Sequence, residues 1–178
     1  MKILFIGIDK DLLYNAARQL QSVNDNFNIA PTFTTDLSMQ GHITENFIYY
    51  MPLKEAELAY RNNAFFWVFS SKHTSTGMTI QDYYKSDILV IDFYGVSNIS
   101  EPMMKMLFKD GVVIVQVDSK NTKHTNIDIT ESKFALQRLQ NQDILYFCDD
   151  APEIIAHTIM KYINADERQK KAIVESLL

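Results

Sequence analysis

The sequence predicts an α/β protein with a mostly parallel sheet sandwiched between helices and a small β-rich lobe inserted into it. Three observations predict this class. Short apolar segments alternate with segments of helical periodicity along the whole chain, which is typical of a parallel sheet covered on both faces. The apolar run at residues 2–8 breaks at Gly7 and continues with helical spacing. The middle of the chain, residues 33–69, is richer in aromatic residues and in strand-like segments than the rest.

The first elements are a buried strand, a tight turn and a helix over residues 10–20. Asp9 or Asp11 is expected to cap this helix, whose apolar residues recur at a spacing of about 3.6. A second strand is expected to end at Thr34, Thr35 and Asp36.

The β-rich middle contains two more predicted strands, at residues 47–51 and 64–69. A helix that starts at Pro52 is expected between them, because proline is tolerated in the first turn of a helix. Residues 70–77 are predicted to form a polar loop, and residues 79–84 a short helix that Thr79 caps.

The second half of the chain is expected to supply most of the parallel sheet. Residues 87–92 are predicted as its clearest central strand, with residues 93–95 as the turn that follows. The remaining predicted strands are 112–117 and 144–147, and the remaining predicted helices are 101–108, 130–139, 152–163 and 166–178. The expected organisation is one domain over residues 1–163, a lobe over residues 33–84 and a C-terminal helix over residues 164–178.

Composition excludes several classes of function. The chain has 178 residues and a net charge of -5, which argues against non-specific binding to nucleic acid. No apolar run approaches the roughly 18 to 20 residues of a membrane span, so no membrane partner is expected and the location is expected to be cytoplasmic. Cys148 is the single cysteine, which excludes an intramolecular disulfide and a multi-cysteine zinc site.

The turn after the first strand is where an α/β protein of this kind would bind a phosphate, at the start of the following helix. A phosphate loop of the GxxxxGK[ST] pattern needs two glycines, a lysine and a hydroxyl. In this chain Gly7 is followed by Ile8, Asp9, Lys10 and Asp11. The turn therefore lacks a phosphate loop, unless Lys10 reaches in from an atypical position.

Several short segments, in their order and spacing, resemble the guanylate kinase family of P-loop nucleoside monophosphate kinases. The resemblance runs from the first strand to about Ile163. The segments that carry it are Phe33-Thr34-Thr35-Asp36, Ile48-Tyr49-Tyr50-Met51, Lys54-Glu55, Asn63-Ala64-Phe65-Phe66-Trp67, Thr76-Gly77-Met78, Val90-Ile91-Asp92-Phe93-Tyr94-Gly95 and Asp143-Ile144-Leu145-Tyr146-Phe147-Cys148-Asp149-Asp150.

The chain departs from this family at the cationic positions. The arginine that grips the acceptor phosphate in the family's Thr-Thr-Arg segment is Asp36 here, and no arginine occurs between Arg18 and Arg61. The segment that matches the family's arginine-bearing lid, residues 118–128, holds only two lysines and a histidine as basic residues. Because phosphoryl transfer depends on positioning and on positive charge, the resemblance implies a degenerate member of the family.

The resemblance therefore implies a catalytically inactive guanylate-kinase-like domain, a pseudokinase that acts as a protein-interaction or nucleotide-binding module. Its partner is expected to be a protein or a small nucleotide, and no catalytic residue, metal site or cofactor is expected. The ligand-binding candidates are Gly7, Lys10, Thr34, Thr35, Tyr49, Tyr50, Gly77 and Asp92.

Six of these eight candidates, all but the two glycines, also have a purely structural interpretation. Lys10 is then a solvated charge at a helix start, the threonines close a strand, the tyrosines fill the core, and Asp92 caps a turn. Two other functions stay open. One is a divergent nucleoside monophosphate kinase, acting on a substrate such as GMP with ATP and Mg, in which Lys10 binds phosphate. The other is a small assembly or regulatory protein that forms a homo-oligomer through its C-terminal helix.

Overall fold

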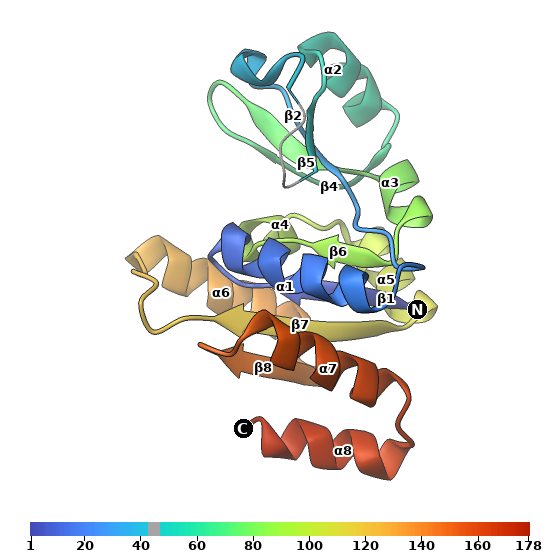
Figure 1. The fold of residues 1–178 in the computed structure, drawn as a ribbon. Helices are drawn as coiled ribbons and strands as arrows, with labels where there is room; N and C mark the ends of the chain where they lie inside the picture. Colours follow the sequence, from blue (N-terminus) through green and yellow to red (C-terminus); the bar gives the residue numbers. More distant parts are fainter. Residues whose placement is uncertain (43–46) are drawn as a thin grey trace.

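Two sheets, one above the other in Figure 1, form the framework of the protein. The structure is a computed structural model that describes residues 1–42 and 47–178. The lower, core sheet contains β1 (Lys2–Ile6), β6 (Ile88–Val90), β7 (Val112–Asp118) and β8 (Ile144–Cys148). These strands are all parallel and lie in the order β6-β1-β7-β8, so that their carboxyl ends meet at one edge.

Helices cover both faces of the core sheet. α1 (Lys10–Val23) and α7 (Pro152–Ile163) cover one face, and α4 (Phe93–Ser97), α5 (Glu101–Asp110) and α6 (Asn126–Arg138) cover the other. Successive residues of a strand point to opposite faces. Accordingly, Phe5 packs with α1 and α7, whereas Leu4 packs with α5 and α6.

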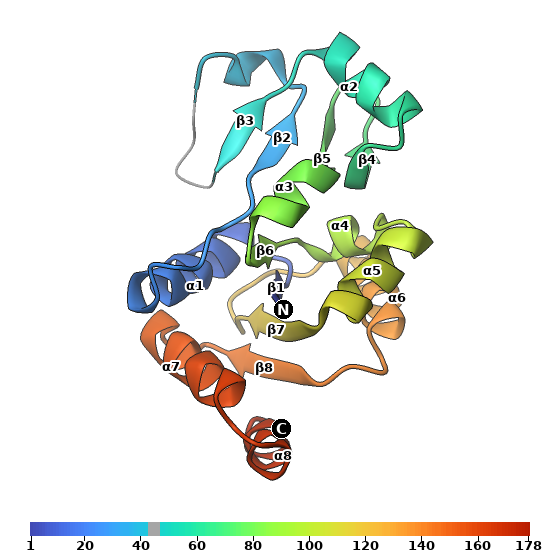
Figure 2. The same cartoon turned by 90° about the vertical axis from the view of Figure 1, so that its right-hand side faces the viewer.

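The upper sheet belongs to the inserted segment, and Figure 2 shows it standing above the core sheet and its helices as a separate layer. Its strands are β2 (Thr32–Thr34), β3 (Ile48–Tyr50), β4 (Phe65–Ser70) and β5 (Ser75–Thr79), in the order β3-β2-β5-β4. The short helix η1 (Leu37–Met39), α2 (Leu53–Arg61) and α3 (Ile80–Lys85) complete it. Residues 43–46 of the predicted lobe lie outside the described residues.

Local signals explain where several of these elements begin and end. Of the two possible caps of α1, Asp9 is the one used, since its side chain accepts hydrogen bonds from backbone N–H groups of the first turn. Thr79 caps α3 in the same way, as predicted. Gly111 ends α5 with a φ of 81°, a conformation that favours glycine. α7 spans Pro152–Ile163 as predicted.

The prediction of a central strand at residues 87–92 is wrong, because β6 is the outermost strand of the core sheet. Its apolar sequence has another cause. Ile88, Leu89 and Val90 are buried, since helices cover both faces and residues 28–30 run along the open edge. The backbone N–H of Ala30 donates to the carbonyl of Ile88 over 2.8 Å, which closes that edge.

Three other predictions of local structure need correction. Residues 70–77 are not one loop, because Ser75–Thr79 forms β5, which pairs with both β2 and β4. Residues 93–95 do not form a simple turn but begin α4, a short helix that Asp92 caps. α6 begins at Asn126 rather than near residue 130, since Thr125 and Asp128 form a capping box there.

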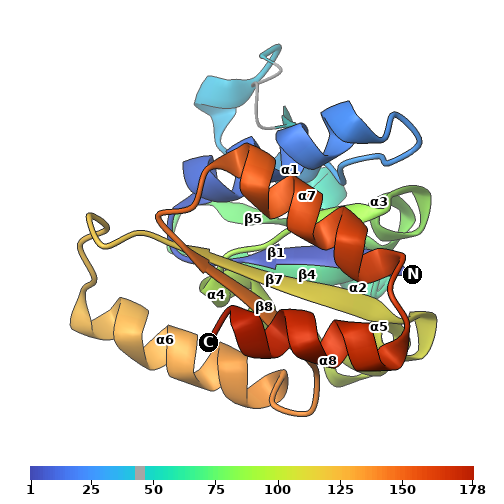
Figure 3. The same ribbon diagram turned by 60° about the horizontal axis from the view of Figure 1, so that its bottom comes forward.

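The last helix, α8 (Glu167–Ser176), lies against the lower end of the molecule beside α7 and β8 (Figure 3). Ile173 is buried there, and Val174 and Leu177 pack against the core, whereas Leu178 is 93% exposed. Self-association through this helix stays a prediction. Among the helices of residues 1–42 and 47–178, none has the length and apolar content that crossing a bilayer requires.

Candidate functional site

The turn between β1 and α1 consists of Gly7, Ile8 and Asp9 alone. A Cβ atom on Gly7 would lie 2.5 Å from the carbonyl oxygen of Val117, so only glycine lets β1 end this close to β7. The loop is thus too short to wrap a phosphate in the manner of the GxxxxGK[ST] pattern. Here the glycine serves close strand packing.

Two of the N–H groups at the start of α1 are occupied by the chain itself. The Oδ1 atom of Asp9 accepts hydrogen bonds from the backbone nitrogens of Asp11 at 3.0 Å and Leu12 at 3.3 Å. A helix N-terminus attracts anions because these N–H groups carry partial positive charge. The carboxylate of Asp9 therefore takes the place that a bound phosphate would take.

Lys10 and Asp92 form an ion pair between the first helix and the end of β6. The Nζ atom of Lys10 lies 3.1 Å from Oδ2 of Asp92, and the Asp92 side chain is 14% exposed. The other carboxylate oxygen of Asp92 accepts a hydrogen bond from the backbone N–H of Gly95 over 2.8 Å and so caps α4. The structure thus pairs these two candidates with each other.

A cavity of about 290 Å³, here called the interlobe cavity, lies between the upper sheet and the core beside this ion pair. Three aromatic side chains form its apolar wall, namely those of Trp67, Phe69 and Tyr94, and Thr76 completes the lining with the ion pair. Trp67 is buried, and its indole N–H is without a hydrogen-bond partner among the described residues. An adjoining hollow of about 20 Å³, which Trp67 also lines, is large enough for one water molecule.

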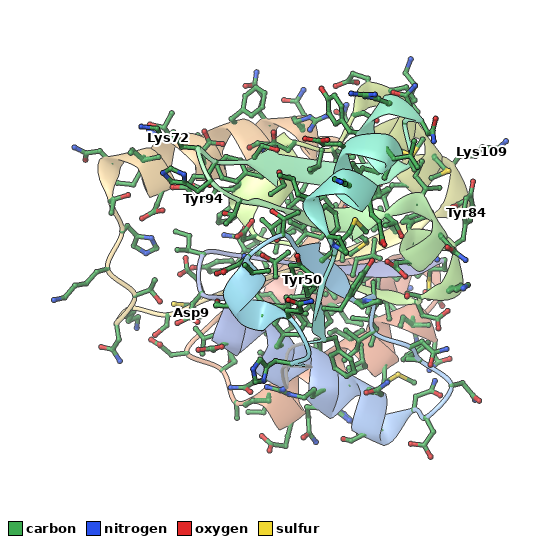
Figure 4. All side chains as sticks on the ribbon, turned by 90° about the horizontal axis from the view of Figure 1, so that it is seen from above. Asp9, Tyr50, Lys72, Tyr84, Tyr94 and Lys109 are labelled. Carbon is green, nitrogen blue, oxygen red and sulfur yellow. The ribbon has the colours of Figure 1, made fainter. Side chains whose placement is uncertain are left out.

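Acidic side chains line the carboxyl edge of the core sheet. Asp9 follows β1, Asp92 follows β6, Asp118 ends β7, and Asp149 and Asp150 follow β8. Figure 4, viewed from above, places Asp9 and Tyr94 on the side where the loop after β7 emerges, and Lys109 at the opposite end. This edge therefore concentrates negative charge, which Lys10 offsets in part through its ion pair with Asp92.

The polar loop after β7 contacts the aspartates of this acidic edge. The hydroxyl of Ser119 donates to Asp149 over 2.6 Å, and His124 lies 3.8 Å from Asp118. In the part of the chain that the structure describes, no three metal-binding side chains come together as an ion site would require. The hydrogen bond from Ser119 fixes the start of this loop, which belongs to the lid-like segment at residues 118–128, against the end of β8.

With this geometry in place, comparison with solved structures identifies the architecture. The chain resembles the crystal structure of guanylate kinase from Anaplasma phagocytophilum with a TM-score of 0.51. The match covers 90% of this chain and 82% of that one, at 14% sequence identity. The fold is guanylate-kinase-like. At this level of identity the likeness establishes the fold alone. No protein-family model and no curated protein sequence matches the chain.

The guanylate-kinase-like fold confirms the predicted fold class, and the structure locates each predicted site residue within it. Lys10 and Asp92 line the interlobe cavity, and Gly7 lies at the end of β1 next to them, its carbonyl accepting from the N–H of Phe93. The other five candidates lie in or directly beside the upper sheet. Their role in binding stays a prediction.

The hydroxyl groups of the upper-sheet candidates serve the lobe itself. Oγ1 of Thr34 accepts from the N–H of Asp36 over 3.2 Å, and Oγ1 of Thr35 accepts from the N–H of Ser75 over 2.8 Å. Tyr49 donates to Asp82 over 3.0 Å. Burial, and then the charge of Asp82, raise the pKa of the Tyr49 hydroxyl above its ordinary value.

Of the two remaining candidates, Gly77 has a packing role and Tyr50 lies away from the cavity lining. A Cβ on Gly77 would lie 2.4 Å from the carbonyl oxygen of Trp67, so glycine is needed for β5 to fit against β4. Tyr50 is half-buried on β3 and is not among the side chains that line the interlobe cavity. Figure 4 shows it near the centre of the view from above.

Four residues that line the cavity are not among the ligand-binding candidates predicted from the sequence, namely Trp67, Phe69, Thr76 and Tyr94. Trp67 and Phe69 lie in an apolar strand, and such strands usually belong to the core, so their sequence carries no signal for a cavity. Tyr94 was hidden by the assignment of residues 93–95 to a turn. The larger hollow of about 770 Å³ between α7 and α8 lies at the other end of the molecule.

Proposed function

We propose that this protein is a guanylate-kinase-like binding module that does not transfer phosphoryl groups. The observation that carries the proposal is the closed start of α1, where Asp9 occupies the N–H groups that a donor phosphate would need. Phosphoryl transfer is almost wholly positioning and electrostatic stabilisation. A domain that places a carboxylate at the phosphate position opposes both.

The charge distribution around the cleft supports the same proposal. Among the described residues that line the interlobe cavity, Lys10 is the basic one, and its charge is already matched by Asp92 at 3.1 Å. Among the residues of the acceptor side, Asp36 stands where the family has an arginine, and its carboxylate accepts from the N–H of Ser38 over 3.0 Å. Little positive charge is left to stabilise a transferring phosphoryl group.

The interlobe cavity supports a small ligand as the molecule that the module binds. Its volume of about 290 Å³ is near the lower limit of ligand pockets, and its aromatic wall suits a flat ring. The polar end offers a hydrogen-bond donor, Lys10, next to an acceptor, Asp92. We therefore favour a nucleoside or a nucleotide over a protein segment as the occupant, with the base in the cavity.

A divergent nucleoside monophosphate kinase is the second candidate. The specific observation in its favour is that the ammonium of Lys10 faces the cavity rather than only the outer solvent. This candidate requires ATP and Mg, and it requires Lys10 to exchange its partner Asp92 for a phosphate during the reaction.

Titration calorimetry and a coupled assay for nucleoside diphosphate separate the two candidates. The module is expected to bind guanosine or GMP without forming a diphosphate when ATP and Mg are present. Lys10→Met should weaken this binding, whereas Lys109→Met, which changes an exposed lysine on α5, should not. Turnover at an ordinary enzymatic rate that Lys10→Met abolishes would establish the kinase and overturn the binding module.

A further inference from the structure

Tyr94 is the residue at which three parts of the molecule meet. It lies on α4 of the core, next to Asp92. Its ring contacts that of Phe69 on β4 in an edge-on arrangement, with centroids 6.2 Å apart and planes at 63°. Its hydroxyl donates a hydrogen bond to Oδ1 of Asp128 in the first turn of α6 over 2.9 Å. Figure 4 shows Tyr94 on the same side of the molecule as α6.

Asp128 in turn sets where the polar loop after β7 ends. Its Oδ2 atom accepts from both the backbone N–H and the hydroxyl of Thr125, each over 2.7 Å. The N–H of Asp128 donates back to Thr125 over 3.1 Å, which completes the capping box. The hydrogen bonds from Thr125, followed by that from Tyr94, lower the pKa of the Asp128 carboxyl.

The two oxygens of one carboxylate thus have different partners, one in the loop and one on α4. A carboxylate is rigid and planar, so a rotation that follows a displaced Tyr94 also moves the oxygen that holds Thr125. Phe69 is on the other side of Tyr94 and belongs to the β4–β5 hairpin. Contacts therefore run without a gap from the hairpin to the end of the loop.

We propose that Tyr94 couples the position of the β4–β5 hairpin to the order of residues 119–130. Phe69 and Tyr94 both line the interlobe cavity, so a molecule that enters it contacts the coupled pair directly. A displacement of the β4–β5 hairpin then changes the order of the loop after β7 and of the start of α6 in the same direction. It is a property of the fold and does not depend on which ligand the cavity takes or on whether the protein is a catalyst.

Hydrogen exchange measured by mass spectrometry on the full chain tests this coupling. The variants are Phe69→Ala, Tyr94→Phe and the double variant. Phe69→Ala is expected to speed exchange across residues 125–130 several-fold, although Phe69 is on β4 of the upper sheet and that segment is the start of α6. Tyr94→Phe removes the hydrogen bond to Asp128 and should do the same, by up to about tenfold. Because Tyr94→Phe breaks the connection, adding Phe69→Ala to it should speed exchange there no further.

Two exposed residues of the same lobe supply matched controls. Leu58→Ala and Tyr60→Phe change side chains on α2 that are 60% and 68% exposed, and both should leave exchange in residues 119–130 unchanged. Circular dichroism checks that each variant is folded. If Phe69→Ala does not fold, Phe69→Leu keeps most of the apolar volume without the ring edge and should act in the same direction.

Two results would overturn the coupling. One is an effect of the Phe69 substitution confined to β4, β5 and α4, with residues 119–130 unaffected. The other is full additivity of the two substitutions in residues 125–130, since independent effects add and effects through one connection do not.

Discussion

Removing the carboxylate of Asp9 tests whether the start of α1 is closed by the protein's own charge. Asp9→Ala removes the acceptor of two hydrogen bonds, of 3.0 and 3.3 Å. Loss of a helix N-cap costs about 1 kcal/mol, and loss of a negative charge at the positive end of a helix adds about 0.5 kcal/mol. For a chain of this size, about 1.5 kcal/mol lowers the melting temperature by roughly 3–6 °C.

Asp9→Ser separates the cap from the charge. Serine caps helices about as well as aspartate, so this variant should lose only the charge contribution, or roughly 1–2 °C. Its helix start is then open to an external anion. For a site with a dissociation constant of about 10 mM, adding about 50 mM phosphate stabilises the folded state by roughly 1 kcal/mol.

Thermal melts with and without phosphate, with sodium chloride at matched ionic strength as the control, measure both effects. Asp9→Ser should gain a phosphate-dependent rise of about 2–4 °C that the natural chain lacks. An equal rise in the natural chain would refute the reasoning, because it would mean that an anion reaches the start of α1 despite the carboxylate.

Three further predictions concern packing and buried polar groups. Gly77→Ala should destabilise the fold by at least about 2 kcal/mol in urea denaturation, since the new methyl would lie 2.4 Å from the carbonyl oxygen of Trp67, a backbone atom that cannot rotate away. Lys2→Met should cost about 3 kcal/mol, because the buried Lys2 ammonium donates to the carbonyls of Tyr83 and Ser86, whereas Lys109→Met on the surface should stay within about 0.5 kcal/mol. Burial raises the pKa of Tyr14 to about 12, so its unfolded form loses the proton first. The free energy of unfolding of the natural chain, taken relative to Tyr14→Phe, should therefore be constant below about pH 9 and fall by about 2 kcal/mol by pH 12. A difference that is flat across this range in pH-dependent urea melts would contradict the burial.

The elements that the sequence predicts well are those with local physical causes. Asp9 and Thr79 cap their helices because a short side-chain oxygen reaches the N–H groups two or three residues ahead. Gly111 ends a helix because it tolerates a positive φ, and Pro152 begins one because its missing N–H would have no partner there. Such signals lie within a few residues of the element that they define.

The errors arise where a partner distant in sequence decides the structure. Residues 75–79 are polar and short, and they become a strand only because β2 and β4 pair with both of their edges. Residues 88–90 are apolar enough for a central strand, yet they lie at the edge because residues 28–30 cover it. The spacing of apolar residues indicates which positions are buried, but it does not indicate which other element covers them.

The same division applies to the candidate site. The amino-acid sequence by itself determined the fold class and the absence of a GxxxxGK[ST] pattern after the first strand, because these depend on which residues are present and in what order. Only the tertiary structure decided that Lys10 pairs with Asp92 and that Trp67, Phe69 and Tyr94 wall a cavity beside them. These residues come from three separate segments, and the upper sheet must close over the core before their side chains can meet.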